Sequence, residues 1–268
     1  MLYPRTIVRI CYIWMTELEK GKKKFVDMKK IFLLLLCLIY LMSQAFSQTI
    51  VDYINSGKNK IESGDYYGAI SDFSRVLELT PKDMIANTGF IYSQIGSLKF
   101  KLKDYPGTIS SYNEAIRLDP SSSSNYFFRA IAKEALNDSY GAISDYTRTI
   151  ELDPSDSYNY YARGNLKSGL NDDEGAIKDY SKAIELKSDE YTYYYFRGRS
   201  FDKIKNYPGA IRDYVRTTEL NPNYAIAYFA LGMLLIDGGV KKEGCENIIK
   251  AGLLGYDKAY DYYKMYCK

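Results

Sequence analysis

A fourteen-residue segment that begins with glycine is repeated along most of the chain. Its clearest copy reads Gly-Ala-Ile-Ser-Asp-Tyr-Thr-Arg-Thr-Ile-Glu-Leu-Asp-Pro over residues 141–154. The other copies cover 68–81, 107–120, 175–188 and 209–222, so successive copies end 39, 34, 34 and 34 residues apart. A fixed period of this length indicates stacked supersecondary units, none of which can bury its apolar face alone. We therefore expect the 268 residues to form one elongated repeat array.

Each copy has the spacing of an amphipathic helix. In the copy at 141–154, Ala142, Tyr146 and Ile150 fall on one helical face, and Pro154 ends the helix because it lacks an amide donor. In the copy at 175–188 serine replaces the final proline, so we expect that helix to run on further. A second amphipathic segment precedes each copy, and short polar turns between the two predict antiparallel helix hairpins.

With both helices in place, the chain resembles a tetratricopeptide repeat protein. The preceding helix of each unit carries an aromatic and, four residues on, a small residue, as in Tyr160 and Gly164. The repeated segment itself carries a small residue and, four residues on, an aromatic. These pairs are Ala69 and Phe73, Thr108 and Tyr112, Ala142 and Tyr146, Ala176 and Tyr180, and Ala210 and Tyr214. The resemblance implies an all-α, right-handed superhelical solenoid of antiparallel helix hairpins that binds other proteins.

Six repeat units are predicted over residues 50–255, followed by a capping helix at 256–268. The units are expected at 50–83, 89–122, 123–156, 157–190, 191–224 and 225–255. The longer first interval places five additional residues around 84–88. The final segment is expected to cover the last apolar face, because a repeat array needs an atypical terminal element.

The N-terminus has the pattern of a secretory signal peptide at 28–47. Two lysines after Met28 precede about a dozen apolar residues, and small residues stand at Ala45 and Ser47. Cleavage is expected between Ser47 and Gln48, which leaves no stable membrane span, and the alternative is an uncleaved anchor. Residues 1–27 show no repeat pattern, and they form either an unstructured upstream extension or a misassigned start.

Three arginines are matched by three aspartates sixteen residues later. The pairs are Arg129 with Asp145, Arg163 with Asp179, and Arg197 with Asp213. Each pair is symmetric about its turn, so an antiparallel hairpin places its members opposite one another. Because both members are absent together from the second and sixth units, we interpret them as structural ion pairs within hairpins. The alternative is a row of arginines that binds an acidic ligand.

Two of the four cysteines stand in the last two predicted helices. Cys245 and Cys267 each lie eleven residues from Tyr256, so antiparallel packing would bring them to the same end of a hairpin. In an exported protein this arrangement predicts a disulfide, and the alternative is two buried thiols.

The first helices are expected to line a concave groove that binds a protein or peptide. The candidate groove residues are Phe127, Ile131, Tyr158, Tyr161, Asn165, Tyr195, Arg199 and Phe229. Tyrosine and arginine are common interface anchors. The alternative is that these rings only pack against one another.

No pattern in the sequence predicts an enzyme, a metal site or a cofactor. The chain has no histidine, no CxxC pair and no glycine-rich phosphate loop. Residues 1–47 hold eight of the 36 basic and three of the 33 acidic side chains, so the rest carries a net charge of −2, which does not favour nucleic acid. Together with the signal-like segment, the resemblance implies an exported, non-catalytic scaffold for protein–protein contacts at the bacterial envelope, periplasmic or secreted. The alternatives are a glycan- or cell-wall-associated binding module, or an accessory subunit of an envelope enzyme complex.

Overall fold

The computed structural model describes residues 23–81 and 88–268 and divides the chain into two units. The first unit ends at Lys82, and its described part consists of α2 (Lys23–Glu62) and α3 (Tyr66–Leu79), which pack against each other. The second unit begins at Asp83 and contains α4 to α14. The predictions for residues 1–22 and for most of the additional residues at 84–88 lie outside the described residues.

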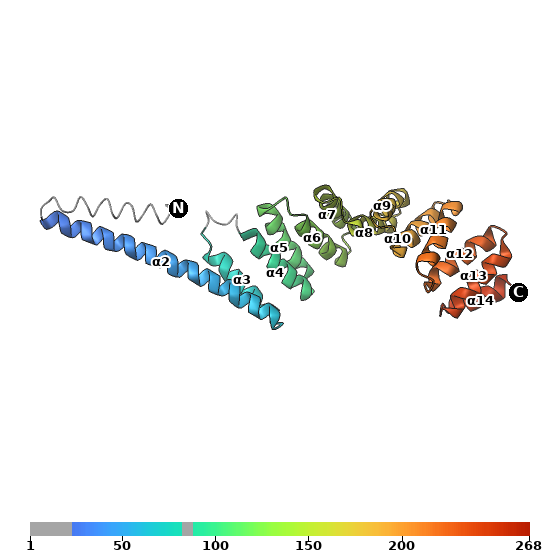
Figure 1. The fold of residues 1–268 in the computed structure, drawn as a ribbon, viewed down its shortest axis with the longest axis horizontal. Coiled ribbons are helices and arrows are strands. Elements are labelled where there is room, and N and C mark those ends of the chain that lie inside the picture. The colour runs from blue at the N-terminus through green and yellow to red at the C-terminus, as the bar shows by residue number, and fades with distance from the viewer. Residues whose placement is uncertain (1–22, 82–87) are drawn as a thin grey trace. The chain divides into compact units, whose positions relative to one another are not determined.

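The second unit is a stack of helix hairpins in chain order (Figure 1). Its helices are α4 (Gly89–Lys101), α5 (Tyr105–Leu118), α6 (Ser123–Ala135), α7 (Ser139–Leu152), α8 (Ser157–Gly169), α9 (Asp173–Leu186), α10 (Tyr191–Lys203), α11 (Tyr207–Leu220), α12 (Ala225–Asp237), α13 (Lys241–Leu253) and α14 (Lys258–Tyr266). Each first helix (α4, α6, α8, α10, α12) packs on the second helix that follows it, and each second helix packs on the next element. The described residues contain helices and no strand.

The capping hydrogen bond at the start of the second helix explains why the repeated segment begins with glycine. Asp138 precedes α7, and its side chain accepts a hydrogen bond from the Gly141 amide at 3.0 Å. A Cβ atom at Gly141 would overlap that same carboxylate, so the capping interaction requires glycine there. The same aspartate–glycine pair opens α3, α5 and α9, and Asn206 with Gly209 opens α11.

The turn between the two helices of a hairpin contains one left-handed residue. This residue is Lys103, Asn137, Asn171 and Lys205 in four successive hairpins, with φ between 60° and 65°. Asparagine adopts this conformation more readily than lysine does. The turns with Lys103 and Lys205 therefore keep the same geometry although lysine disfavours it.

The core is built around one large side chain from each second helix, an aromatic ring in α3, α5, α7, α9 and α11 and Ile248 in α13. Phe73, Tyr112, Tyr146, Tyr180 and Tyr214 are all at most 1% exposed. A Cβ at Gly164 would lie 2.8 Å from the Tyr180 ring, which explains the small residue on the facing first helix.

Two features of the helices differ from the sequence prediction. The prediction that the helix before Ser188 runs on is wrong, because α9 ends at Leu186, at the same repeat position as α7. Lys187 takes an extended conformation and its amide bonds to the Ala183 carbonyl, so the hairpin junction ends the helix without proline. In addition, the predicted signal segment and the first helix of the first repeat are one continuous helix, α2.

Candidate protein-binding face on the first helices

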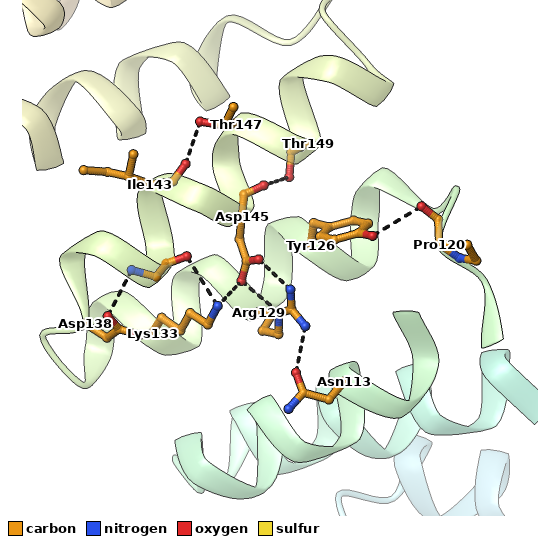
Figure 2. Close-up of polar contacts among 11 residues, drawn as sticks. Asn113, Pro120, Tyr126, Arg129, Lys133, Asp138, Ile143, Asp145, Thr147 and Thr149 are labelled. Carbon is orange, nitrogen blue, oxygen red and sulfur yellow. Dashed lines mark hydrogen bonds and ion pairs between the residues drawn. The ribbon is translucent and has the colours of Figure 1, made fainter. Parts of the chain in front are cut away.

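The predicted ion pairs are close, and they join neighbouring repeats as well as the two helices of a hairpin. Arg129 donates from Nε and Nη2 to the two carboxylate oxygens of Asp145, at 2.8 and 2.6 Å (Figure 2). Lys133 lies 2.7 Å from the same carboxylate, whose side chain is 4% exposed. The remaining Nη1 of Arg129 donates to Asn113 on α5 of the preceding repeat, at 2.7 Å.

The same three-part contact recurs in the next two repeats. Arg163 binds Asp179 and donates to Thr147, and Arg197 binds Asp213 and donates to Ser181. The third partner was missed in the sequence, although it stands a constant sixteen residues before each arginine. These arginines are occupied by structural partners, so they are not free to line a groove for an acidic ligand.

The repeats differ in the second cation on each aspartate. Lys133 and Lys167 lie within 2.8 Å of Asp145 and Asp179. At the equivalent position of the fifth repeat stands Phe201, and the Arg197 guanidinium lies 5.8 Å from the centre of its ring. Asp213 therefore has only Arg197 as its ion-pair partner among the described residues.

Aromatic side chains of successive first helices contact one another across the hairpins. The Phe127 ring on α6 lies 6.1 Å from Tyr158 on α8, and Tyr158 lies 6.0 Å from Tyr161. Tyr161 in turn lies 5.6 Å from Phe196 on α10. We call the surface of α6, α8 and α10 that carries these rings the first-helix face. It consists of Phe127, Ile131, Glu134, Tyr158, Tyr161, Asn165, Phe196, Arg199 and Asp202.

Four predicted groove residues remain accessible or partly accessible on this face. Tyr158 is 45% exposed, and Tyr161 is partly buried. The Asn165 side-chain oxygen accepts a hydrogen bond from the Tyr180 hydroxyl at 2.8 Å. Arg199 is exposed, and its guanidinium lies over the rings of Tyr195 and Phe196.

The other four predicted groove residues are engaged in packing. Tyr195 is 8% exposed, because Tyr224 and Phe196 pack on it. Phe127 and Ile131 pack against the core cluster around Tyr146. Phe229 is covered by Tyr256 and Tyr262 at the C-terminal end, with ring centres 4.7 and 5.0 Å away.

Two carboxylates of the first-helix face were missed in the sequence. Burial raises the pKa of Glu134, and the neighbouring Tyr146 hydroxyl only partly opposes this. Burial raises the pKa of Asp202 as well, and the carboxylate of Asp237 adds to the effect. The signal available in the sequence was their spacing of two repeats, since Asp202 follows Glu134 by 68 residues.

The two C-terminal cysteines form a disulfide. Cys245 on α13 bonds to Cys267, which directly follows α14, and their Cα atoms lie 5.8 Å apart. The bond links the capping helix to the last hairpin. Around the turn between them, α13 and α14 also line an open apolar hollow of about 430 Å³, with Ile249, Leu253, Tyr256 and Tyr260 among its lining residues.

Nothing in the described part of the chain is arranged for metal chemistry. No group of three or more Cys, Asp or Glu side chains within 23–81 and 88–268 could hold a metal ion. The polar groups of the first-helix face, Glu134, Asn165, Arg199 and Asp202, come from three helices, α6, α8 and α10.

These features define a repeat protein whose first helices present a face of aromatic and polar side chains. The tetratricopeptide repeat family model matches residues 157–190, which is the predicted fourth unit. The chain thus carries a tetratricopeptide repeat in this unit, and its fold is an all-α solenoid of helix hairpins. No curated protein matches its sequence.

Solved structures of tetratricopeptide repeat proteins share this fold at low sequence identity. A crystal structure of MamA is 23% identical with a TM-score of 0.59, and the match covers 62% of this chain and 97% of MamA. YrrB, described as a TPR protein with an unusual peptide-binding site, is 16% identical with a TM-score of 0.63, over 72% of this chain and 97% of YrrB. The C-terminal part of a TPR protein from Cytophaga hutchinsonii is 17% identical with a TM-score of 0.67, over 80% of this chain and 87% of that one.

Proposed function

We propose that this protein is a non-catalytic scaffold that binds another protein or a peptide along the first-helix face. The observation that carries the proposal is the ring series from Phe127 through Tyr158 and Tyr161 to Phe196, which links three repeats. Partly exposed tyrosines on rigid helices offer a large contact area at low entropic cost. The likeness in fold to YrrB, whose description names a peptide-binding site, supports the same use.

Cross-linking in intact cells followed by mass spectrometry tests this proposal. We expect partner cross-links near the first-helix face to be lost in a Tyr158→Ala/Arg199→Ala variant, because both side chains are exposed and their removal leaves the core intact. The matched control is Tyr140→Ala, which removes a 76% exposed tyrosine from the second helix α7. If the double variant and the control give the same cross-links as the unmodified protein, the binding face is elsewhere.

A glycan is the alternative ligand, since exposed rings also stack on sugars. The same captured material distinguishes the two. Protease treatment should abolish the capture of a protein partner, whereas glycosidase treatment should abolish the capture of a glycan.

We further propose that the chain is exported and acts at the bacterial envelope. Within the described residues one stretch, Phe32–Glu62, is long and apolar enough to cross a membrane, and its most apolar window is not buried. Such a helix near the N-terminus fits either a signal sequence or an anchor. The Cys245–Cys267 disulfide is in keeping with an oxidising compartment.

The mass of the protein recovered outside the cytoplasm tests this location. A cleaved signal predicts a chain that begins at Gln48, and an uncleaved anchor predicts the apolar segment intact in the membrane fraction. Recovery of the protein only from the cytoplasm would contradict both forms of the proposal.

A further inference from the structure

Two carboxylates occupy the same position of first helices two repeats apart. Glu134 lies near the end of α6 and Asp202 near the end of α10. Ser168 holds the equivalent position on α8 between them, and its hydroxyl is used within the protein because it donates to Asp173 at 2.7 Å. The acidic positions therefore alternate along the first-helix face.

The surroundings of Glu134 contain unsatisfied polar atoms. Its Oε1 atom has no solvent exposure and no hydrogen-bond partner among the described residues. The Tyr146 hydroxyl, on a residue that is 0% exposed, lies beside the Glu134 carboxyl and partly offsets the rise in its pKa that burial causes, although neither atom has the geometry of a full hydrogen bond. A buried oxygen without a partner costs free energy that a bound donor could recover.

The first helix that follows places a ring on Tyr112 and on Tyr180, but not on Tyr146 or Tyr214. Phe128 stacks on Tyr112 at 5.8 Å, and Phe196 packs on Tyr180 at 6.4 Å. The equivalent residue next to Tyr146 is Ala162, and next to Tyr214 it is Ala230. The two repeats with a carboxylate are thus the two in which the following first helix supplies a methyl group in place of a ring.

The lysines and arginines of α6, α8 and α10 already have other contacts, so neither carboxylate has a cationic partner among the described residues. Arg129, Arg163 and Arg197 bind their aspartates, joined by Lys133 and Lys167, and Lys203 lies 3.3 Å from Asp173. Arg199 lies over aromatic rings. None of the described ion pairs includes Glu134, Asp202 or the neighbouring Asp237.

A cationic side chain from a partner would complement this arrangement. It could pair with Glu134 while its alkyl stem lies along the exposed ring of Tyr158, and a cation over an aromatic face gains further stabilisation. A second cation would meet Asp202 and Asp237.

We propose that the first-helix face recognises a basic peptide segment of a partner protein, with one lysine or arginine at Glu134 and a second at Asp202. This inference rests on the proposed function and adds the chemistry of the partner. Glu134 is the primary anchor, because its Oε1 atom is buried and the carboxyl has no cationic partner among the described residues.

Selection of random twelve-residue peptides on the full chain tests the proposal. We expect peptides selected on the unmodified protein to be enriched in lysine or arginine at two positions. The enrichment at one position should disappear with Glu134→Gln and at the other with Asp202→Asn, while the preference for apolar and aromatic residues remains. Glu151→Gln is the matched control, since Glu151 is an exposed glutamate on the second helix α7 and pairs with Arg148.

A binding measurement on the best selected peptide makes the test quantitative. Glu134→Gln should weaken binding about tenfold, which corresponds to about 1.4 kcal/mol, and Glu151→Gln should leave it unchanged. Replacing the peptide cation by glutamine should cost a similar factor with the unmodified protein and little with Glu134→Gln, as direct pairing requires.

The outcomes separate this inference from the proposed function. Enriched peptides that lack basic residues, or whose basic residues persist in both variants, would overturn the inference while a peptide-binding face remained. Failure to enrich any peptide would contradict the proposed function itself and the basic segment with it.

Discussion

The fifth and sixth repeats join their neighbours by different chemistry at the same positions. At the joint between the fourth and fifth repeats, Ser181, Arg197 and Asp213 form a hydrogen-bonded ion pair. One repeat later the same positions hold Val215, Leu231 and Asn247, and Leu231 is buried in an apolar cluster. All three positions change together, so the polar contact is one solution to packing first helices against the preceding repeat. The sixth repeat has a covalent link instead, because a disulfide joins α13 to the capping helix.

Removing the arginine from the polar joint should have the largest effect. Arg197→Ala leaves Asp213 buried without a cation, and we expect it to lower the free energy of unfolding by about 3–5 kcal/mol. Arg163→Ala should cost clearly less, because Lys167 still lies 2.8 Å from Asp179. Urea denaturation of the two variants gives the comparison. Equal losses would mean that the second lysine does not stabilise its aspartate.

Breaking the disulfide should have the next largest effect, confined to the end of the array. A Cys245→Ser/Cys267→Ser variant lacks the cross-link that constrains the unfolded chain between α13 and α14. We therefore expect the free energy of unfolding of this end to fall by about 2–4 kcal/mol. Hydrogen exchange should accelerate in α13 and α14 and remain unchanged in α6 to α9, since each repeat contacts only its neighbours. Acceleration along the whole second unit would show that the cap stabilises the entire stack.

Glu134→Gln should stabilise the free protein at neutral pH by about 1 kcal/mol, because it removes a half-buried carboxylate without an ionic partner. The raised pKa of Glu134 means that the folded state binds its proton more tightly than the unfolded chain does. The stability difference between the variant and the unmodified protein should therefore be small below pH 4.5 and grow as the pH rises through the folded pKa. A difference that is constant with pH would contradict an unpaired carboxylate.

Converting the polar joint into the apolar one should change stability by less than about 1 kcal/mol. In Ser181→Val/Arg197→Leu/Asp213→Leu the buried charges leave together, and well-packed apolar replacements of an ion pair are often neutral. Denaturation of this variant beside Arg197→Ala shows whether the cost comes from the joint or from the orphaned charge. A loss as large as that of Arg197→Ala would indicate that the joint itself requires the ion pair.

The smallest effect is expected in the turns between hairpin helices. Lys205 is held at φ 61°, where glycine avoids the steric cost of a side chain, so Lys205→Gly should add roughly 0.5–1 kcal/mol. Asn171→Gly is the matched control and should change stability less, since asparagine tolerates this conformation. Thermal unfolding of both variants measures the difference.

The repeat period predicted the hairpins well, because each is built from local signals. The glycine at 141 and the fixed spacing of Arg129 from Asp145 follow directly from one hairpin's geometry. The depth of individual side chains could not be predicted in this way. Tyr161 and Tyr195 hold the same repeat position, yet Tyr195 is buried because Phe196 and Tyr224 pack on it, whereas Tyr161 is only partly buried. Glu134 was missed because a single glutamate in a helix resembles any solvated one until its neighbours are placed.

A photoreactive phenylalanine analogue placed at 158 in living cells tests the central claim most directly. We predict a discrete adduct with a partner protein at this position, and none when the analogue replaces Tyr140, which is more exposed but lies on a second helix. Adducts at 140 and none at 158 would contradict a binding face on the first helices.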